Sequence, residues 1–363
     1  MGHWLRGMLV GLAALVLAVV AIGMGYRAWR QRENGLAMAM AAPNGIEQTG
    51  FVAIGGIDQW ISIRGRDRAN PVILLLHGGP GLAMSPLQLW FVPWERDFTV
   101  VQWDQRGAGL TYGRYGKATP DLSEEQIVQD GIELAEYLCR RLHKKKIVLL
   151  GHSWGSQIGL QMIRRRPDLF SAYVGTGQAV DNAEAERRGY ERLLRMAQSG
   201  GDARTVAALK QLGPAPYADA DAMMSERRLA AAYAPPGERD YLMKSTPTAL
   251  FAPGISLMDL YDNVSGALYS GSRLFAEASA FKAERLGTSF ATPVFFFQGD
   301  LDDIAPADLV AAYFAKIEAP QKALVRFRGG GHLTLLTMRE EFLRQLDVRV
   351  RPLAAGRDGV PTH

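Results

Sequence analysis

The fold of this chain is decided by the stretch Ile147-Val148-Leu149-Leu150-Gly151-His152-Ser153-Trp154-Gly155-Ser156. The apolar run that opens with β-branched residues predicts a buried strand, and the segment after the serine is compatible with a helix. Between them, Gly-x-Ser-x-Gly predicts a sharp turn that exposes the Ser153 hydroxyl. Glycines are expected at both positions because a side chain there would collide with neighbouring backbone. The first amides of the helix would then point at Ser153.

The composition indicates a globular protein. The chain has 363 residues, of which 48% are hydrophobic and 21% charged, and its formal net charge is +4. This length predicts one α/β core with an insertion. The small net charge, with Lys144-Lys145-Lys146 as the main basic run, argues against a nucleic-acid partner. A single cysteine, Cys139, excludes disulfide and zinc-finger frameworks and is expected to be a small buried hydrophobe.

An apolar segment near the N-terminus predicts a single membrane-spanning helix. Twenty consecutive uncharged residues run from Gly7 to Tyr26, and a helix of that length rises about 30 Å, the thickness of the bilayer hydrocarbon. A cleavable signal peptide is the alternative, because Ala39-Met40-Ala41 resembles a cleavage site. The long apolar run and the arginines before that site favour a retained anchor. These arginines are Arg27, Arg30 and Arg32.

The charges that flank this segment predict its orientation. Positive charge is heavier after the span than before it, where only Arg6 and the terminal amine contribute, so the positive-inside rule favours a cytoplasmic folded domain. Residues 31–44 are expected to be a short tether, and Pro43-Asn44-Gly45 predicts a turn before the globular part. Residues 1–44 therefore form the predicted anchor and tether.

Strands and helices are expected to alternate in the globular part, which predicts right-handed crossovers and a mostly parallel sheet. The first two strands, joined by Gly55-Gly56, predict an antiparallel hairpin at the sheet edge. Ser123 is expected to cap the helix that precedes the strand before Ser153. The predicted strands are 51–54, 59–64, 71–76, 99–103, 147–150, 171–175, 293–297 and 323–327, and two late helices are predicted at 306–317 and 333–346.

The alternation breaks after residue 180. From 181 to 287 the chain is helical and rich in loops, with prolines throughout, and we interpret it as an inserted cap. The predicted domains are thus the anchor and tether (1–44), the first part of the core (45–180), the helical cap (181–287) and the second part of the core (288–363).

A serine hydroxyl needs a base and a carboxylate to act as a nucleophile. Of the six histidines, only His332 follows a late strand on a glycine-rich loop, downstream of an acidic loop. The carboxylate that orients the histidine has three candidates, Asp300, Asp302 and Asp303. Asp302 is favoured because its loop would return over the carboxyl edge of the sheet. The order Ser153, Asp302, His332 differs from the orders in chymotrypsin and subtilisin.

A second loop offers donors for an oxyanion. His77-Gly78-Gly79-Pro80-Gly81 follows a strand that is expected to be buried on both faces. The candidate donors are the backbone N–H of Gly79 and that of Trp154, the residue after the serine.

Three motifs together resemble the proline iminopeptidase branch of the α/β-hydrolase superfamily, and the resemblance spans residues 45–346. They are the loop from His77 to Gly81, Trp103-Asp104-Gln105-Arg106-Gly107, and the turn around Ser153. The resemblance implies an α/β-hydrolase fold and a serine hydrolase that forms an acyl-enzyme without cofactor or metal. It agrees with catalytic roles for Ser153, Asp302 and His332 and with an oxyanion role for Gly79.

The expected substrate is a small molecule or short peptide with an ester, amide or N-terminal peptide bond. Proline iminopeptidases carry glutamates for the amino terminus in a Trp-Glu pair and an Arg-Ile-Glu-Asn-His-Tyr type segment, and neither occurs here. The glutamates available in the cap are Glu184, Glu186, Glu191 and Glu277.

Two alternatives to a peptidase stay open. The anchor and the apolar stretch 249–255 suit a carboxylesterase or lipase-like hydrolase of an amphiphilic ester equally well. A non-catalytic binding module on the same fold is the third hypothesis, which the presence of all three triad candidates argues against. Dehalogenase or epoxide hydrolase chemistry is disfavoured because it needs a carboxylate where Ser153 stands.

Overall fold

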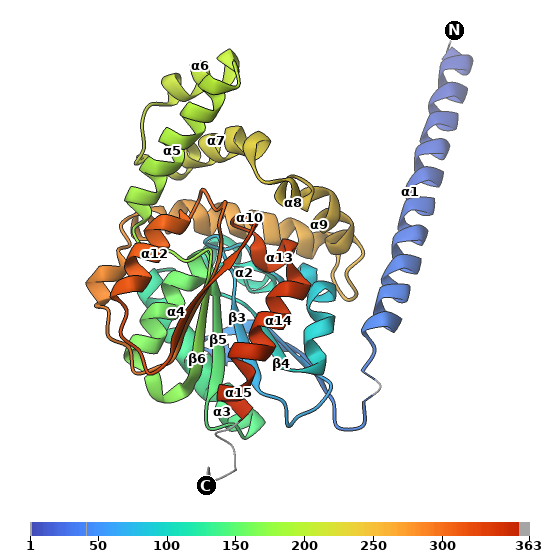
Figure 1. Cartoon of the computed structure of the whole chain (residues 1–363). Helices are drawn as coiled ribbons and strands as arrows, with labels where there is room; N and C mark the ends of the chain where they lie inside the picture. The colour runs from blue at the N-terminus through green and yellow to red at the C-terminus, as the bar shows by residue number, and fades with distance from the viewer. Residues whose placement is uncertain (1, 41, 356–363) are drawn as a thin grey trace.

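The computed structural model describes residues 2–40 and 42–355, and a twisted eight-stranded sheet forms its centre (Figure 1). The strand order is β1-β2-β4-β3-β5-β6-β7-β8. The pairs β1–β2 and β2–β4 are antiparallel and all other pairs are parallel, which confirms the mostly parallel sheet with a hairpin at its edge. The strands are β1 Ile46–Ile54, β2 Ile57–Gly65, β3 Val72–Leu76, β4 Thr99–Asp104, β5 Ile147–His152, β6 Phe170–Thr176, β7 Val294–Gly299 and β8 Lys322–Phe327.

Alternate residues of the central strands enter two separate hydrophobic cores. Leu149 packs with α3 (Glu124–Leu142) and α4 (Trp154–Arg165) on one face, whereas Val148 packs with η1 (Ser85–Arg96) and α14 (Arg339–Arg349) on the other. A strand that is covered on both faces needs no polar alternation, which explains the continuous apolar run in the sequence. The predicted cap of α3 is confirmed, since Ser123 Oγ accepts from the N–H of Gln126 at 3.2 Å.

The C-terminal helix differs from the prediction. The expected single helix at 333–346 is divided into α13 (Thr334–Thr337) and α14, and a further short helix, α15 (Arg351–Ala355), follows them. The break after α13 falls at Met338, whose φ of −121° and ψ of 43° lie outside the helical region. The remaining core helices are α2 Gly109–Tyr115, η2 Gly116–Ala118, η3 Pro167–Leu169 and α12 Ala307–Lys316.

Between β6 and β7 the chain forms a layer of helices over one end of the sheet (Figure 1). A small hydrophobic cluster that includes Tyr190, Leu193 and Leu209 holds the outer helices together. We call this layer the cap helices. They are α5 Asn182–Ser199, α6 Ala203–Leu212, α7 Ala220–Ala230, η4 Ala231–Tyr233, α8 Pro236–Arg239, α9 Tyr241–Leu250, α10 Leu257–Arg273, α11 Phe275–Ser279 and η5 Ala283–Leu286.

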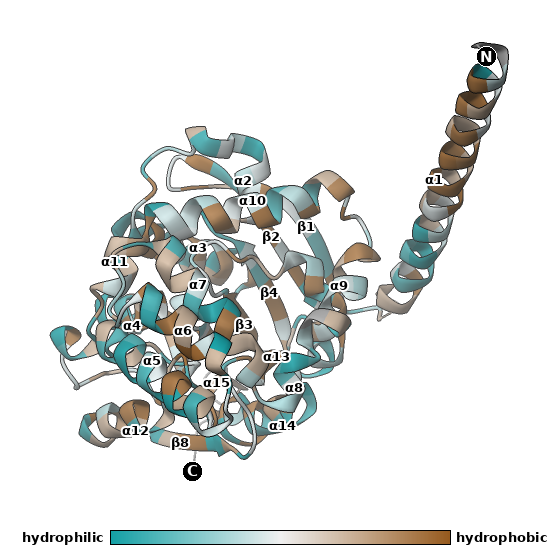
Figure 2. Cartoon of the chain, turned by 90° about the horizontal axis from the view of Figure 1, so that it is seen from above, coloured by the Kyte–Doolittle hydropathy of each residue, from teal (hydrophilic) through white to brown (hydrophobic). Residues whose placement is uncertain are grey.

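The N-terminal helix α1 runs from Gly2 to Met38 and projects away from the sheet in both views (Figures 1 and 2). Its most apolar window has a mean hydropathy of 2.6 and no buried residue, so the helix is long and apolar enough to cross a membrane, a test that a signal sequence also passes. Residues 31–38 of the predicted tether (31–44) are helical and continue α1. Side chains of this end of α1 donate hydrogen bonds to the loop between α9 and α10.

Candidate active site

Ser153 occupies the turn between β5 and α4 in a strained backbone conformation. Its φ is 53° and its ψ is −119°, a region that residues with a Cβ rarely adopt. A Cβ at Gly151 would lie 2.4 Å from the carbonyl oxygen of Gly155, and one at Gly155 would lie 2.2 Å from that of Leu76. A side chain at either glycine would therefore collide with neighbouring backbone, as the sequence predicts. The close packing of β5, α4 and β3 holds the serine at the end of the sheet.

The structure brings together the three residues of the predicted triad. His332 Nε2 lies 2.9 Å from Ser153 Oγ, and His332 Nδ1 lies 3.0 Å from Asp302 Oδ2 and 3.1 Å from Asp302 Oδ1. With the Nδ1 proton donated to the carboxylate, Nε2 is free to accept the proton of the serine hydroxyl. Ser153, Asp302 and His332 follow β5, β7 and β8, because the carboxyl ends of parallel strands meet at one edge of the sheet.

The buried carboxylate of Asp302 is held by three further donors. Gln298 Nε2 donates to Oδ2 at 2.7 Å, and the backbone N–H groups of Ile304 and Ala305 donate to Oδ1 at 2.9 and 2.7 Å. The two neighbouring aspartates, Asp300 and Asp303, have partners other than His332. Asp300 accepts from the N–H of Gly329 at 2.7 Å, and Asp303 pairs with Arg192 at 2.6 Å.

Two other buried histidines lie near the serine turn and have different partners. His77 Nδ1 lies 2.8 Å from the carbonyl oxygen of Gly78, and its Nε2 lies 3.3 Å from the N–H of Gln105. Burial lowers the pKa of His77 to about 4 and that of His152 to about 3. Both rings are therefore neutral at physiological pH, and neither ring lines the two cavities beside Ser153.

The two predicted oxyanion donors line the same cavity as Ser153 and His332. Trp154 is the first residue of α4, so its N–H belongs to the group at a helix start that has no intrahelical acceptor. Gly79 has a φ of +121°, and a Cβ added at the preceding Gly78 would lie 3.2 Å from the Cβ of Ser153, so this loop runs close to the serine turn. Their roles as donors stay a prediction, to which we return below.

Two cavities meet at His332. The smaller, of about 100 Å³, is lined by Gly79, Ser153 and Trp154 from the core and by residues of the cap helices. The larger, of about 290 Å³, shares Arg227, Ile304 and His332 with it. Its remaining lining is mostly apolar and includes Leu193, Met196, Ala230, Ala231, Tyr233, Pro235, Leu301 and Leu333.

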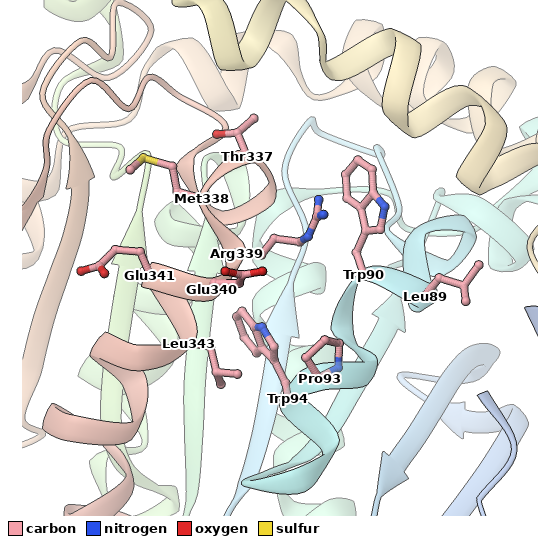
Figure 3. Close-up of a pocket in the computed structure, with 10 residues that line it drawn as sticks. All are labelled: Leu89, Trp90, Pro93, Trp94, Thr337, Met338, Arg339, Glu340, Glu341 and Leu343. Carbon is pink, nitrogen blue, oxygen red and sulfur yellow. The ribbon is translucent and has the colours of Figure 1, made fainter. Parts of the chain in front are cut away.

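A third cavity, of about 450 Å³, lies between η1 and the segment formed by α13 and α14 (Figure 3). Its lining includes Trp90 and Arg339, whose guanidinium lies 4.5 Å from the centre of the tryptophan ring. None of the triad residues lines it. We therefore place the candidate site at the two cavities that share His332.

Of the four cap glutamates singled out in the sequence, only Glu186 lines the Ser153 cavity. It is buried, it accepts from the N–H of Tyr217 at 3.3 Å, and burial raises its pKa. Glu184 and Glu191 pair with arginines of their own helix, and Glu277 accepts from the N–H of Glu124 at 2.6 Å.

Sequence reasoning missed two carboxylates and a cation of the site. Glu226 and Arg227 lie at the larger cavity, 3.5 Å apart. Glu238 Oε1 accepts from the N–H of Leu333 at 2.5 Å, directly after His332, and burial raises the pKa of Glu238. Their sequence surroundings resemble those of any solvated helix charge. In the described part of the chain, no group of three metal-ligating side chains is present.

The fold and the serine turn define an α/β hydrolase, and the model of the alpha/beta hydrolase fold family matches residues 71–337. The chain belongs to this family and is a hydrolase. Over 285 residues, 77% of this chain and 89% of the relative, it is 29% identical to the probable aminopeptidase YbaC of Bacillus subtilis. It is also 34% identical to a probable proline iminopeptidase of Streptomyces coelicolor, over 33% of this chain and 36% of that protein. The resemblance stated from the motifs is thereby confirmed.

Solved structures show the same fold at low sequence identity. The proline iminopeptidase of Mycobacterium smegmatis superposes with a TM-score of 0.61 at 17% identity, covering 85% of this chain and 99% of that one. A bacterial membrane phospholipase A superposes with a TM-score of 0.59 at 12% identity, covering 96% and 99%. At these identities the likeness concerns the fold alone.

Proposed function

We propose that the protein is a serine hydrolase in which Ser153 is the nucleophile, His332 the general base and Asp302 the residue that orients and stabilises the imidazolium. The observation that carries this proposal is the continuous chain of hydrogen bonds from Asp302 through His332 to Ser153, which ends on a strained serine at a cavity. A serine with a merely structural role needs neither the strained turn nor a buried carboxylate behind its histidine partner.

The geometry supports a two-step acyl transfer. Ser153 Oγ attacks the substrate carbonyl while His332 Nε2 takes its proton, and the N–H groups of Gly79 and Trp154 stabilise the resulting oxyanion. His332 then gives the proton to the leaving group as its bond breaks, which forms the acyl-enzyme. A water molecule, deprotonated by His332, hydrolyses the acyl-enzyme and restores Ser153.

Each of the two cavities would hold one part of the substrate, either the acyl group or the leaving group. The leaving group lies on the His332 side because it receives its proton from Nε2. We therefore assign it to the apolar cavity of about 290 Å³, and the acyl group to the cavity of about 100 Å³ beside Ser153, Gly79 and Trp154. This division favours a small acyl group joined to a larger apolar leaving group.

The finer proposal is an aminopeptidase of the proline iminopeptidase type, in which residues 181–287 act as the cap. Glu186 supports it, because a buried carboxylate in the acyl cavity can bind the ammonium group of a small N-terminal residue. The names of the two relatives point the same way. The apolar lining of the larger cavity favours a second candidate, an esterase for amphiphilic esters.

We further propose that α1 is a retained single-pass anchor, and that its flanking charge places the catalytic domain on the cytoplasmic side.

The first test replaces Ser153. Ser153→Ala leaves no nucleophile, so turnover of every substrate should fall by a factor of about 10⁴ or more while the circular dichroism spectrum and the unfolding midpoint stay unchanged. Activity at the level of the parent in a folded Ser153→Ala protein would refute the serine mechanism.

The second test separates the peptidase from the esterase. Prolyl and alanyl anilides are compared with their N-acetylated forms and with short acyl esters. Glu186→Gln should lower kcat/KM for the free-amine anilides by about 10- to 100-fold, because a charge-assisted hydrogen bond contributes about 1.5–3 kcal/mol, and should leave the esters unaffected. Glu184→Gln, two residues away in surface ion pairs, is the matched control. Ester turnover with no anilide turnover would favour the esterase.

A further inference from the structure

Helix α10 has its polar and small residues inside and its large apolar residues outside. Asn263, Gly266 and Ser270 are its buried residues. Asn263 Nδ2 donates to the carbonyl oxygen of Ala83 at 3.2 Å, and Ser270 Oγ donates to that of Gly107 at 2.7 Å. Because these contacts bond α10 to the loops after β3 and β4, its inner face is already occupied by the core.

The opposite face of α10 is apolar and exposed, with five large side chains that are each between 46% and 67% exposed. At about 100° per residue, these positions fall on one stripe directly opposite the buried residues. The charged residues of α10, Asp259, Asp262 and Arg273, lie outside that stripe. The five residues, which we call the α10 outer face, are Leu257, Met258, Tyr261, Val264 and Leu268.

The lower end of α1 is bonded to the segment that immediately precedes α10. Arg27 Nη2 donates to the carbonyl oxygen of Ile255 at 2.6 Å, and Gln31 Nε2 donates to those of Ala252 and Ile255, both at 2.8 Å. Asn34 Nδ2 donates to the carbonyl oxygen of Phe251 at 2.9 Å. These side-chain bonds attach the anchor helix to the cap, and Figures 1 and 2 both place this end of α1 beside α9.

The bilayer surface is expected at the level of these contacts. The uncharged run of α1 ends at Tyr26 and is followed by Arg27, and aromatic and arginine side chains of this kind gather where the hydrocarbon meets the headgroups. The Tyr26 ring lies 5.6 Å from that of Phe251, in an edge-on contact. These contacts put the cap segment 251–255 level with the end of the apolar run of α1, and α10 begins two residues beyond that segment.

We propose that the α10 outer face lies in the headgroup region of the same bilayer that α1 spans, so that the cap is held on the membrane by two elements. This inference rests on the proposed role of α1 as a retained anchor. The occupant is lipid, because an uncharged apolar face that continues directly from the anchor's exit point meets the bilayer before any other partner. Since Gly271, near the end of α10, lines the Ser153 cavity, amphiphilic substrates would enter close to the lipid surface.

A spin-label experiment on the full chain tests this placement. Cys139→Ser removes the single native cysteine, and Val264→Cys carries the label on the α10 outer face. Val348→Cys is the matched control, because Val348 is an equally apolar residue on α14, outside the cap helices, and is 66% exposed against 60% for Val264. Each labelled protein is reconstituted at one copy per nanodisc of phosphatidylcholine and phosphatidylglycerol, and collisions with oxygen and with a water-soluble nickel chelate are measured.

At position 264 we expect the ratio of oxygen to nickel collisions to exceed that at position 348 by about tenfold. Equal ratios at the two positions would overturn the proposal, because α10 would then face water. Protection of position 264 from both reagents would also overturn it, since protein would then cover the face. A chain that does not enter the nanodisc would contradict the anchor itself, and with it the α10 placement, while the serine mechanism is tested separately in solution.

A functional comparison extends the test. Tyr261→Asp combined with Leu268→Asp should raise KM for a vesicle-borne ester by about tenfold and leave kcat/KM for a soluble anilide or ester unchanged. An unchanged KM for the vesicle-borne substrate in the folded variant would count against the proposal.

Discussion

Asp104 is a buried carboxyl with little compensation for its charge. Its Oδ2 accepts from Ser85 Oγ and from the N–H of Leu110, both at 2.8 Å, while its Oδ1 is buried without a partner in the described part of the chain. Desolvation outweighs these two bonds and raises the pKa of Asp104 to about 7. The residue belongs to one of the family motifs, yet it lines neither of the two cavities beside Ser153.

This pKa predicts a pH-dependent stability. In the unfolded chain the carboxyl has an ordinary pKa of about 4, so between about pH 4 and 7 the folded state binds more protons. The free energy of unfolding therefore falls as the pH rises through this interval. Asp104→Asn keeps an acceptor but cannot ionise, and its stability relative to the parent should rise by up to a few kcal/mol from pH 5 to pH 8. Denaturant unfolding at both pH values measures this, with Asp58→Asn, whose side chain is 43% exposed, as the control. Parallel pH profiles for the parent and Asp104→Asn would contradict the prediction.

At the scale of elements, Arg106 joins the hairpin, the loop before α3 and α3 itself. It forms a bidentate pair with Asp130 at 2.8 and 3.0 Å, and it donates to the carbonyl oxygens of Pro120 and Gly55 at 2.8 and 2.7 Å. Both partners of the ion pair are almost fully buried. A guanidinium suits this position because its planar fork reaches three separate segments at once.

Removal of this guanidinium should be costly. Arg106→Ala leaves the Asp130 carboxylate buried and unpaired, so we expect a loss of about 3–5 kcal/mol in the free energy of unfolding. Arg106→Lys should recover only part of it, because an ammonium cannot reproduce the fork. Urea unfolding followed by circular dichroism measures both variants, and a lysine variant as stable as the parent would show that charge alone suffices.

At the scale of the whole molecule, α1 is both the predicted anchor and a structural part of the cap. The bonds from Arg27, Gln31 and Asn34 to segment 251–255 lie beyond the apolar run, and Arg64 Nη2 donates to the carbonyl oxygen of Met38. A soluble form should therefore keep residues 25–38. Removal of everything before Asn44 would discard these contacts along with the span.

Two truncated chains test whether residues 25–38 stabilise the folded domain. A chain that begins at Gly25 retains the contacts with the cap, whereas one that begins at Ala39 loses them. Because each hydrogen bond contributes about 1 kcal/mol, the shorter chain should unfold at a temperature lower by about 5 °C or more. Differential scanning calorimetry compares the two, and equal midpoints would show that the lower half of α1 does not stabilise the folded domain.

Much of the fold and of the candidate site is predictable from the sequence because the relevant signals are local. The strand before Ser153, its two glycines and the cap at Ser123 each depend on a few adjacent residues. The positions of Asp302 and His332 after late strands follow from the rule that parallel strands end at one edge. The attachment of residues 31–38 to the folded domain has no signal in the sequence, because Gln31 and Asn34 find their partners more than 200 residues away.

The sequence by itself determined the class of fold, the order of the elements, the candidate triad and the apolar span, since hydrophobic periodicity and glycine placement are properties of short stretches. Only the tertiary structure decided which carboxylates line the cavities beside Ser153 and that the α10 outer face is exposed. Glu184 and Glu186 are equivalent as sequence, but one faces arginines at the surface and the other lines the Ser153 cavity. The physical reason is that burial depends on contacts between segments far apart in the chain, which no local pattern specifies.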